Sequence, residues 1–338
     1  MALAPQVLLT DLLRDVSRSF YLTLSVLPRS VRSQVGLAYL LARTTDTIAD
    51  TAVLPLELRL RELRRFGDRI AGGAGEPLDF KDLAGRQGSG AERTLLDNAE
   101  AAVGLLATFS AADQALIREV LRIIVSGQEL DLTRFHNASA GRVTALQSAA
   151  ELDDYTYRVA GCVGEFWTRI CRAHVYPRAR LDDDRMLALG VRFGKGLQLV
   201  NILRDLPADL ANGRCYLPAD ALQDAGLQPP DLLDPTAWTR LRPVYQTWLN
   251  TAADHLAAGW DYTTSLPWSA VRVRLACAWP LLIGRDTVLE LGRANVLTPG
   301  QRVKISRSRV RNILLKSALF YPFPGAWRAL YPALPQPV

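Results

Sequence analysis

Two aspartates lie four residues apart in an apolar stretch of the sequence. In Asp46-Thr-Ile-Ala-Asp50 the i and i+4 spacing places both carboxylates on one face of a helix, with their Cβ atoms roughly 6 Å apart. Like charges at this spacing repel each other, so the pair requires a counter-charge. Such pairs most often lie on a solvated face. Because residues 35–49 are mostly apolar, however, this pair is predicted to be ion-paired or metal-bound.

A second pair has the same spacing. Asp205-Leu-Pro-Ala-Asp209 follows the largely apolar segment 196–203. Pro207 removes one helical hydrogen bond, so Asp209 is expected at or just past a kink or a helix end. One pair alone would be weak evidence, but two pairs in apolar segments favour a functional interpretation.

The pairs have a chemistry in common. Mg²⁺ prefers oxygen ligands, keeps several waters and commonly bridges carboxylate and phosphate oxygens. Guanidinium groups bind phosphate oxygens bidentately. Arginines lie near the motifs at these positions: Arg18, Arg43, Arg204 and Arg214. A metal and arginines beside a diphosphate neutralise the charge that develops as it leaves, so the pattern predicts a magnesium–diphosphate site.

The composition excludes several other classes. Three histidines and four cysteines, all scattered, form no zinc spacing and no disulfide scaffold. Forty Lys and Arg against 34 Asp and Glu give a net charge of +6, which is compatible with anionic ligands or an acidic membrane surface. No signal peptide and no apolar run of about 18 residues is visible. We therefore expect a cytoplasmic monomer with no nucleic-acid partner.

The elements that carry these residues are predicted to be helices. Leu, Ala, Arg and Glu dominate the long segments, and strand-like alternation is nearly absent. The expected helices cover about 30–52, 55–71, 90–108, 111–136, 142–173, 183–206, 235–264, 268–293 and 305–320. We expect one large all-α domain over 1–320, built on a central bundle, followed by a tail over 321–338.

The tail is aromatic, basic and broken by prolines. Phe320-Tyr-Pro-Phe-Pro324 and Trp327 follow an apolar segment that Arg311 and Lys316 interrupt. Two alternatives stay open for it. It makes a peripheral contact at the inner face of the membrane, where Trp and Tyr are favoured, or it packs on the body of the protein.

Taken in order, these motifs resemble the squalene/phytoene synthase family. The resemblance rests on five segments over roughly 200 residues: Ser17-Arg-Ser-Phe20, Tyr39 to Asp50, Asp154-Tyr155 to Gly164, Gly196 to Asp209, and Gly213-Arg214 to Pro218. It implies a helical fold of the isoprenoid synthase type with a central apolar cavity. It also implies head-to-head joining of two farnesyl diphosphates.

The resemblance assigns roles residue by residue. It implies that Asp46, Asp50, Asp205 and Asp209 hold Mg²⁺, and that Tyr155 stabilises the allylic cation or assists proton loss. The residues that it implies bind the substrate diphosphates are Ser17, Arg18, Ser19, Tyr39, Arg43, Gln198, Asn201, Arg204 and Arg214.

A C-terminal segment separates the branches of the family. Cys277-Ala-Trp-Pro280, Asn295 and Val303-Lys304-Ile-Ser-Arg307 resemble squalene synthases, which implies NADPH binding at Asn295, Lys304 and Arg307 and squalene as the product. Several alternatives stay open. Lys304 and Arg307 also fit a solvated helix start, and the enzyme could be a phytoene or dehydrosqualene synthase, or stop at presqualene diphosphate. An inactive scaffold relative is a further alternative, which the intact carboxylate pairs disfavour.

Overall fold

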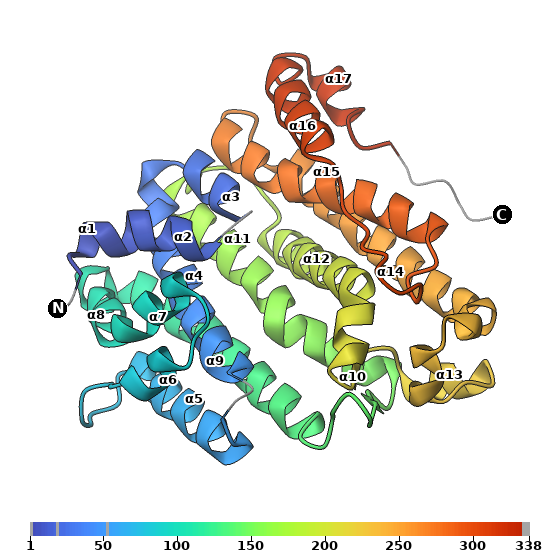
Figure 1. The fold of residues 1–338 in the computed structure, drawn as a ribbon. Helices are drawn as coiled ribbons and strands as arrows, with labels where there is room; N and C mark the ends of the chain where they lie inside the picture. The colour runs from blue at the N-terminus through green and yellow to red at the C-terminus, as the bar shows by residue number, and fades with distance from the viewer. Residues whose placement is uncertain (1–2, 18–19, 52–53, 333–338) are drawn as a thin grey trace. The chain divides into compact units, whose positions relative to one another are not determined.

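The computed structural model of the chain describes residues 3–17, 20–51 and 54–332 (Figure 1). Its contacts divide into two units, which we describe separately. Unit 1 comprises residues up to Thr133 together with Phe166–Arg178, and unit 2 comprises Arg134–Glu165 together with the residues from Ala179 onward. Helices make up nearly all regular structure in both units, which confirms the all-α fold. The expected single domain over 1–320 stays a prediction.

Unit 1 is built around one long helix over Arg29–Asp50, most of whose residues are buried. Its elements are α1 (Pro5–Val7), η1 (Leu8–Leu12), α2 (Leu13–Ser17), α3 (Phe20–Val26), α4 (Arg29–Asp50), α5 (Leu56–Ala71), α6 (Lys81–Gly85), α7 (Gly90–Asp97), α8 (Ala99–Gly104), η2 (Leu105–Thr108), α9 (Ala111–Arg134, whose last residue belongs to unit 2) and the later part of α11 (Cys162–His174). Leu37, Leu40, Leu41 and Ile48 of α4 are completely buried. Helix α4 is therefore the core of unit 1 and fixes the direction of its carboxylates.

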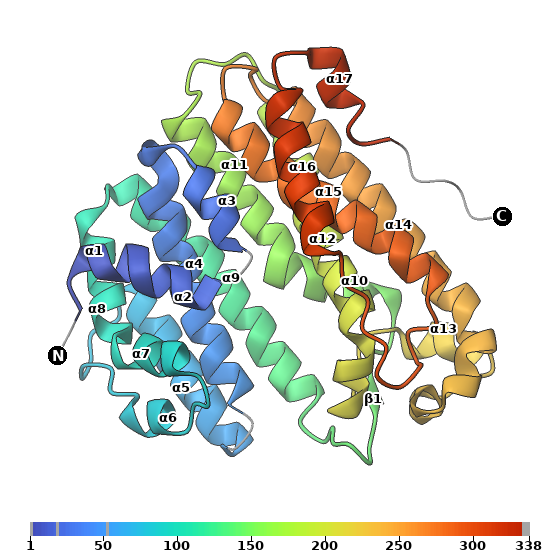
Figure 2. The ribbon, with the colours of Figure 1, turned by 45° about the horizontal axis from the view of Figure 1, so that its top comes forward.

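Unit 2 contains the longest helices. Its elements are β1 (Thr144–Ala145), α10 (Ala149–Thr156), η3 (Tyr157–Gly161), the start of α11, α12 (Asp183–Ala211), β2 (Arg214–Cys215), α13 (Ala219–Asp224), η4 (Pro229–Leu233), η5 (Pro235–Ala237), α14 (Trp238–Ser265), α15 (Val271–Arg293), α16 (Arg307–Leu319) and α17 (Pro324–Arg328). Helix α12 packs along α14, and α14 packs against α15 (Figure 2).

Glycines allow a close approach between η3, the start of α11 and α12. A Cβ atom at Gly194 would lie 2.1 Å from the carbonyl oxygen of Ala160, and a Cβ at Gly164 would lie 1.9 Å from that of Gly190. No side chain fits at either position, because real Cβ contacts are never this short. These glycines therefore bring the segment that follows Tyr155 directly onto the helix that carries Asp205.

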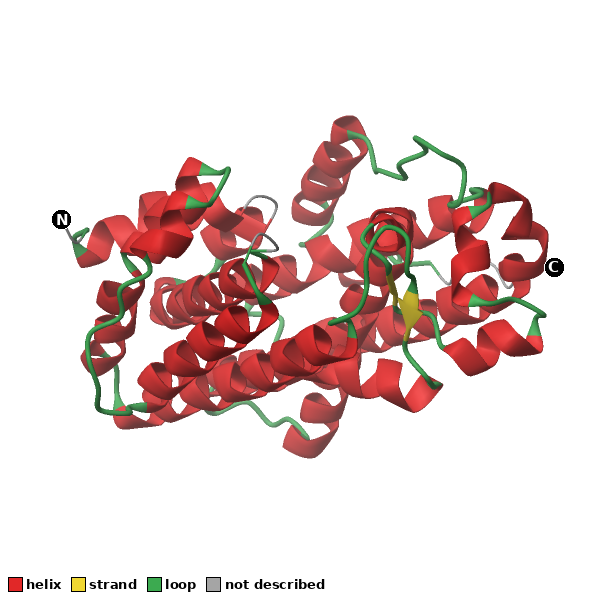
Figure 3. Cartoon of the chain, turned by 60° about the horizontal axis from the view of Figure 1, so that its bottom comes forward, coloured by secondary structure: helices red, strands yellow, loops and turns green. Residues whose placement is uncertain are grey.

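Some predicted boundaries were wrong. Residues 142–148 are not helical, because Thr144–Ala145 pairs in parallel with Arg214–Cys215 (Figure 3). Helix α12 runs through Pro207 to Ala211 instead of ending near 206. The predicted helix over 90–108 is interrupted at Asn98, and the helices over residues 5–17 and over Phe20–Val26 were not expected.

Helix α12 is long and apolar enough to cross a membrane, judged by length and composition alone. In unit 2 it packs against η3, α14 and α15 and buries Leu199, Val200 and Leu203. It also carries the second carboxylate pair. These contacts are those of a core helix, and length and composition alone are weak evidence for a membrane span.

The described part of the tail packs on unit 2. Trp327 is completely buried and stacks on Trp260, with ring centroids 4.9 Å apart. The guanidinium of Arg274 lies 4.6 Å from the ring centroids of both Trp268 and Trp327, a double cation–π contact. The inner side of the tail is therefore part of the fold.

Candidate active site

The first carboxylate pair lies at the C-terminal end of α4. Buried hydroxyls on this helix bond to its own backbone, as Thr44 does to the carbonyl of Leu40 at 2.9 Å, so the polar residues of the motif are accommodated in an apolar core. Asp46 is half-buried and Asp50, the last residue of the helix, is exposed. The i and i+4 spacing on one helix is thus as predicted.

Two polar side chains lie next to Asp46. Gln128 of α9 donates a hydrogen bond from Nε2 to Oδ1 of Asp46, and Arg43 places its NH1 3.9 Å from Oδ2. Arg43 is also paired with Glu92 of α7. The predicted counter-charge is therefore present, but Glu92 shares it.

The surroundings of Asp46 raise the pKa of its carboxyl group. Burial of the carboxyl, followed by repulsion from Asp50, raises the pKa of Asp46 to about 6, although Arg43 and the hydrogen bond from Gln128 act in the opposite direction. A divalent cation would remove this penalty, because it adds positive charge where two carboxylates repel. Among the described residues, the buried Oε1 atom of Gln128 has no hydrogen-bond partner, so the oxygen beside Asp46 fits a role as an additional acceptor for a cation or its water.

The second pair lies in the last turns of α12. Arg204 donates two hydrogen bonds, of 2.6 and 3.0 Å, to the carboxylate of its neighbour Asp205. These bonds raise the pKa of the Arg204 guanidinium. Asp209 lies in the final turn, two residues before the helix ends at Ala211. Asp209 is therefore near the helix end but inside the helix, because α12 continues through Pro207.

A short parallel pairing holds the arginine that follows this helix. Gly213 has φ +75°, and its carbonyl accepts a hydrogen bond of 2.8 Å from the amide of Thr144. A Cβ at Gly213 would lie 2.2 Å from the carbonyl oxygen of Ser139, so this turn requires glycine. The turn leads directly into β2, which fixes the backbone of Arg214 close to the end of α12.

Tyr155 belongs to an aromatic cluster within unit 2. Its ring stacks on Tyr216 with centroids 4.9 Å apart, and the two hydroxyls are 3.5 Å apart. The ring of Phe135 meets Tyr216 edge-on at 5.1 Å. Tyr155 is therefore held by ring packing, with its hydroxyl beside a second phenol.

Four further predicted diphosphate-binding residues lie on helices α2, α4 and α12. The hydroxyl of Ser17 donates to the carbonyl of Leu13 inside its own helix, and Tyr39 stacks on Phe20 at 4.6 Å. On α12, Gln198 is half-buried and Asn201 is exposed. Arg18 and Ser19 lie outside the described residues.

The predicted NADPH-binding residues lie in and after the connection from α15 to α16. Asn295 uses Oδ1 to accept a hydrogen bond of 3.0 Å from the amide of Leu297, which shapes the turn that follows α15. Lys304 and Arg307 are exposed. The structure leaves both cations accessible, as expected both for a nucleotide phosphate site and for a solvated helix start.

The donor set within each pair fits Mg²⁺. Within the described ranges, no three His, Cys, Asp or Glu side chains gather into one metal-binding group. Each pair offers two carboxylates, which suits an ion that keeps waters and binds phosphate oxygens through one or two protein carboxylates. It does not suit an ion that requires a complete cage of protein ligands.

Sequence reasoning missed three neighbours of these groups. Gln128 and Glu92 contact the first pair, and Tyr216 stacks on Tyr155. Gln128 is 82 residues from Asp46 in sequence, and Tyr216 is 61 residues from Tyr155. No local pattern in the sequence could have signalled these contacts.

The helical fold is shared with proteins of known structure. The complex of TcSQS with the ligand E5700 aligns with a TM-score of 0.76 at 22% identity and covers 93% of this chain and 85% of that chain. A dehydrosqualene synthase aligns with a TM-score of 0.65 at 19% identity and covers 94% and 98% of the two chains. At these identities the likeness concerns the helical fold alone.

The family follows from the sequence match. Residues 13–309 match the squalene/phytoene synthase family, and the chain belongs to it. The family is of the isoprenyl transferase type.

Two relatives illustrate the range of this family. A presqualene diphosphate synthase of Rhodopseudomonas palustris is 30% identical over 307 residues, which cover 89% of this chain and 93% of that protein. A bifunctional lycopene cyclase/phytoene synthase of Leptosphaeria maculans is 27% identical over 329 residues, which cover 94% of this chain. The chain spans about half the length of that fungal protein.

Proposed function

We propose that this chain joins two farnesyl diphosphates head to head to give presqualene diphosphate, in a Mg²⁺-dependent reaction. The observation that carries the proposal is the pair of carboxylate–arginine groups, Asp46 and Asp50 with Arg43, and Asp205 and Asp209 with Arg204, in a chain that belongs to this family. The relative matched over nearly its whole length, a presqualene diphosphate synthase, supports the same reaction.

In this proposal each carboxylate pair holds Mg²⁺, Asp46 and Asp50 in unit 1 and Asp205 and Asp209 in unit 2. The ion, when bound, supplies the positive charge that makes a diphosphate a good leaving group. The chain's own contribution is to orient the carboxylates: the buried body of α4 fixes Asp46 and Asp50, and the last turns of α12 fix Asp205 and Asp209.

The arginines are the second element of the proposal. Arg43 and Arg204 are each bonded to a carboxylate in this structure, Glu92 and Asp205 respectively. Each guanidinium has five N–H donors, so it can keep that partner and still donate to phosphate oxygens. Held in this way, they lose little side-chain entropy when a diphosphate binds.

Tyr155 is proposed to act on the hydrocarbon half of the substrate. When one diphosphate leaves, an allylic cation forms, the double bond of the second molecule attacks it, and loss of a proton closes the cyclopropane. The π face of the phenol ring stabilises the cation. Its hydroxyl oxygen accepts a hydrogen bond from the group that carries the departing proton, or its O–H donates one to a phosphate oxygen. Stacking on Tyr216 holds the ring in one orientation for both roles.

A second candidate function adds a reductive step. Here presqualene diphosphate ionises, rearranges and accepts hydride from NADPH to give squalene. The observation in its favour is the Val303-Lys304-Ile-Ser-Arg307 segment, in which Lys304 and Arg307 are exposed, with Asn295 at the preceding turn. Lys304 and Arg307 would bind nucleotide phosphates.

Product analysis tests both candidates. The purified chain is incubated with farnesyl diphosphate or, separately, with geranylgeranyl diphosphate, in each case with Mg²⁺ and with or without NADPH, and the products are identified by mass spectrometry. Presqualene diphosphate without NADPH supports the first proposal, and squalene only with NADPH supports the second. Phytoene from geranylgeranyl diphosphate, dehydrosqualene without NADPH, or no product at all would contradict both, and the last would favour a scaffold protein.

A further inference from the structure

The C-terminal segment of the chain has an unusual charge. After Glu290 it contains no Asp or Glu and eight basic residues: Arg293, Arg302, Lys304, Arg307, Arg309, Arg311, Lys316 and Arg328. The whole chain has a net charge of +6, so residues 1–290 carry a net charge of −2. The entire positive excess of the protein therefore lies in its last 48 residues.

The same segment exposes large apolar side chains. Leu315 is 70% exposed, Leu319 68% and Phe323 61%. Arg311, Leu315 and Leu319 follow each other at intervals of four residues, so they form one stripe along α16. Exposed apolar groups gathered in this way mark an interaction surface more often than single surface leucines do.

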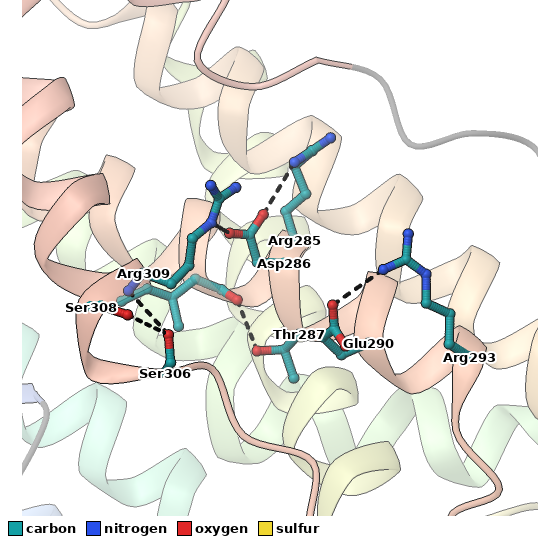
Figure 4. Close-up of polar contacts among 9 residues, drawn as sticks. Arg285, Asp286, Thr287, Glu290, Arg293, Ser306, Ser308 and Arg309 are labelled. Carbon is teal, nitrogen blue, oxygen red and sulfur yellow. Dashed lines mark hydrogen bonds and ion pairs between the residues drawn. The ribbon is translucent and has the colours of Figure 1, made fainter.

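The opposite side of α16 is firmly attached to unit 2. Arg309 binds the buried carboxylate of Asp286 on α15 at 2.6 Å, and Asp286 also pairs with Arg285 at 3.2 Å (Figure 4). The hydroxyl of Ser317 accepts a hydrogen bond of 2.9 Å from Trp279, and the carbonyl of Ser317 accepts one of 3.0 Å from Trp327. These contacts direct the leucines outward, so their exposure is a property of the fold.

We propose that the outer face of α16, defined by Arg311, Leu315, Lys316, Leu319 and the adjoining Phe323, binds a lipid bilayer that contains anionic headgroups. Leucine and phenylalanine would enter the boundary between headgroups and acyl chains, and the basic side chains would contact lipid phosphates. A nucleic acid would attract the basic residues equally well, but its charged backbone offers no apolar environment for the exposed leucines. The combination therefore favours a lipid surface.

Vesicle sedimentation in the absence of substrate tests this proposal independently of the enzyme's reaction. We expect the full chain to bind vesicles of phosphatidylcholine and phosphatidylglycerol in equal parts, and to bind pure phosphatidylcholine at least tenfold more weakly. Binding to the mixed vesicles should weaken as salt is added, because screening reduces the attraction to the anionic surface.

Two double variants separate the apolar and the charged contributions. Leu315→Ser with Leu319→Ser should weaken partitioning by about tenfold for each leucine. Arg311→Gln with Lys316→Gln should weaken it by about fivefold for each charge. The matched controls are Leu233→Ser, an exposed leucine of η4, and Arg242→Gln, an exposed arginine of α14, which should bind as the unaltered chain does.

Three outcomes of the vesicle experiment would overturn the proposal. Equal binding to neutral and anionic vesicles, no binding to either, or unchanged binding of the leucine double variant would each contradict it. Tight binding to duplex DNA or RNA that survives the leucine substitutions would identify a polyanion surface instead. Unchanged circular dichroism of the variants would show that lost binding is not lost folding.

Discussion

The hydroxyl of Tyr245 donates a hydrogen bond of 2.9 Å to the carbonyl oxygen of Leu203. Residue 207 would bond to this carbonyl in a regular helix, but it is proline and has no N–H. Tyr245 comes from α14 and is 1% exposed, so the bond crosses between two packed helices in the core of unit 2. The hydroxyl of Tyr245 thus takes the place of the backbone N–H that is missing at Pro207, which lies between Asp205 and Asp209.

Removing this hydroxyl should destabilise the protein. Tyr245→Phe leaves the buried carbonyl of Leu203 without a partner, at a cost of about 1–3 kcal/mol in the free energy of unfolding. In a Pro207→Ala background the restored backbone N–H reaches the same carbonyl, so Tyr245→Phe should cost clearly less. Denaturant unfolding of the four proteins measures this coupling, and equal costs in both backgrounds would show that Tyr245 does not compensate for the proline.

The raised pKa of Asp46 predicts a pH-dependent stability. Its folded pKa of about 6 lies above the ordinary 3.8, so the folded state holds this proton more tightly than the unfolded state does. Below about pH 4 both states are protonated and there is no difference. Between pH 4 and 6 stability falls as pH rises, and above pH 6 the penalty is constant.

The neutral variant Asp46→Asn should therefore gain stability over the unaltered chain through this pH window. Unfolding measured from pH 4 to 8 without Mg²⁺ should show the difference in the free energy of unfolding growing up to about pH 6 and then levelling off. A difference that does not change with pH would mean that the carboxyl titrates normally.

The close helix contact at Gly194 should not tolerate a side chain. Gly194→Ala places a Cβ 2.1 Å from the backbone oxygen of Ala160, so the helices must separate, at about 2 kcal/mol or more. Gly104→Ala in α8 is the matched control, since no atom lies within 4 Å of its Cβ position, and it should be neutral or slightly stabilising. Similar thermal unfolding of the two variants would refute the close-contact role.

The two parts of Tyr155 can be separated by substitution. Tyr155→Phe keeps the ring that stacks on Tyr216 and loses only the hydroxyl, whereas Tyr155→Leu loses both. If the ring stabilises the cation, the phenylalanine variant should retain more turnover than the leucine variant. Equal loss in both would assign the role to the hydroxyl, and full activity of both would remove Tyr155 from the mechanism.

Much of the helical framework was predictable because it depends on local signals. A helix was expected to begin near residue 183, and the carboxylate of Asp182 caps it by accepting a hydrogen bond of 3.0 Å from the amide of Arg185. Ser110 caps α9 in the same way, with a bond of 3.1 Å from the amide of Asp113. The spacing of the aspartates fixed which of them share a helix face.

What could not be predicted depends on contacts distant in sequence. The pairing of Thr144–Ala145 with Arg214–Cys215 overrides the local helical preference around residue 144. Gln128 reaches Asp46 only because α9 packs in the same unit as α4. The partner of the carbonyl freed by Pro207, Tyr245, lies 42 residues from Leu203.

The central claim is that the carboxylate pairs support head-to-head condensation, and one assay tests it most directly. Farnesyl diphosphate and Mg²⁺ are given to the unaltered chain, to Asp46→Asn and to Asp205→Asn, and presqualene diphosphate is quantified by mass spectrometry. The account predicts product from the unaltered chain and a loss of at least a hundredfold, about 2.7 kcal/mol of transition-state stabilisation, in each variant with unchanged helical circular dichroism. Undiminished product from either variant, or no presqualene diphosphate from the unaltered chain, would contradict it.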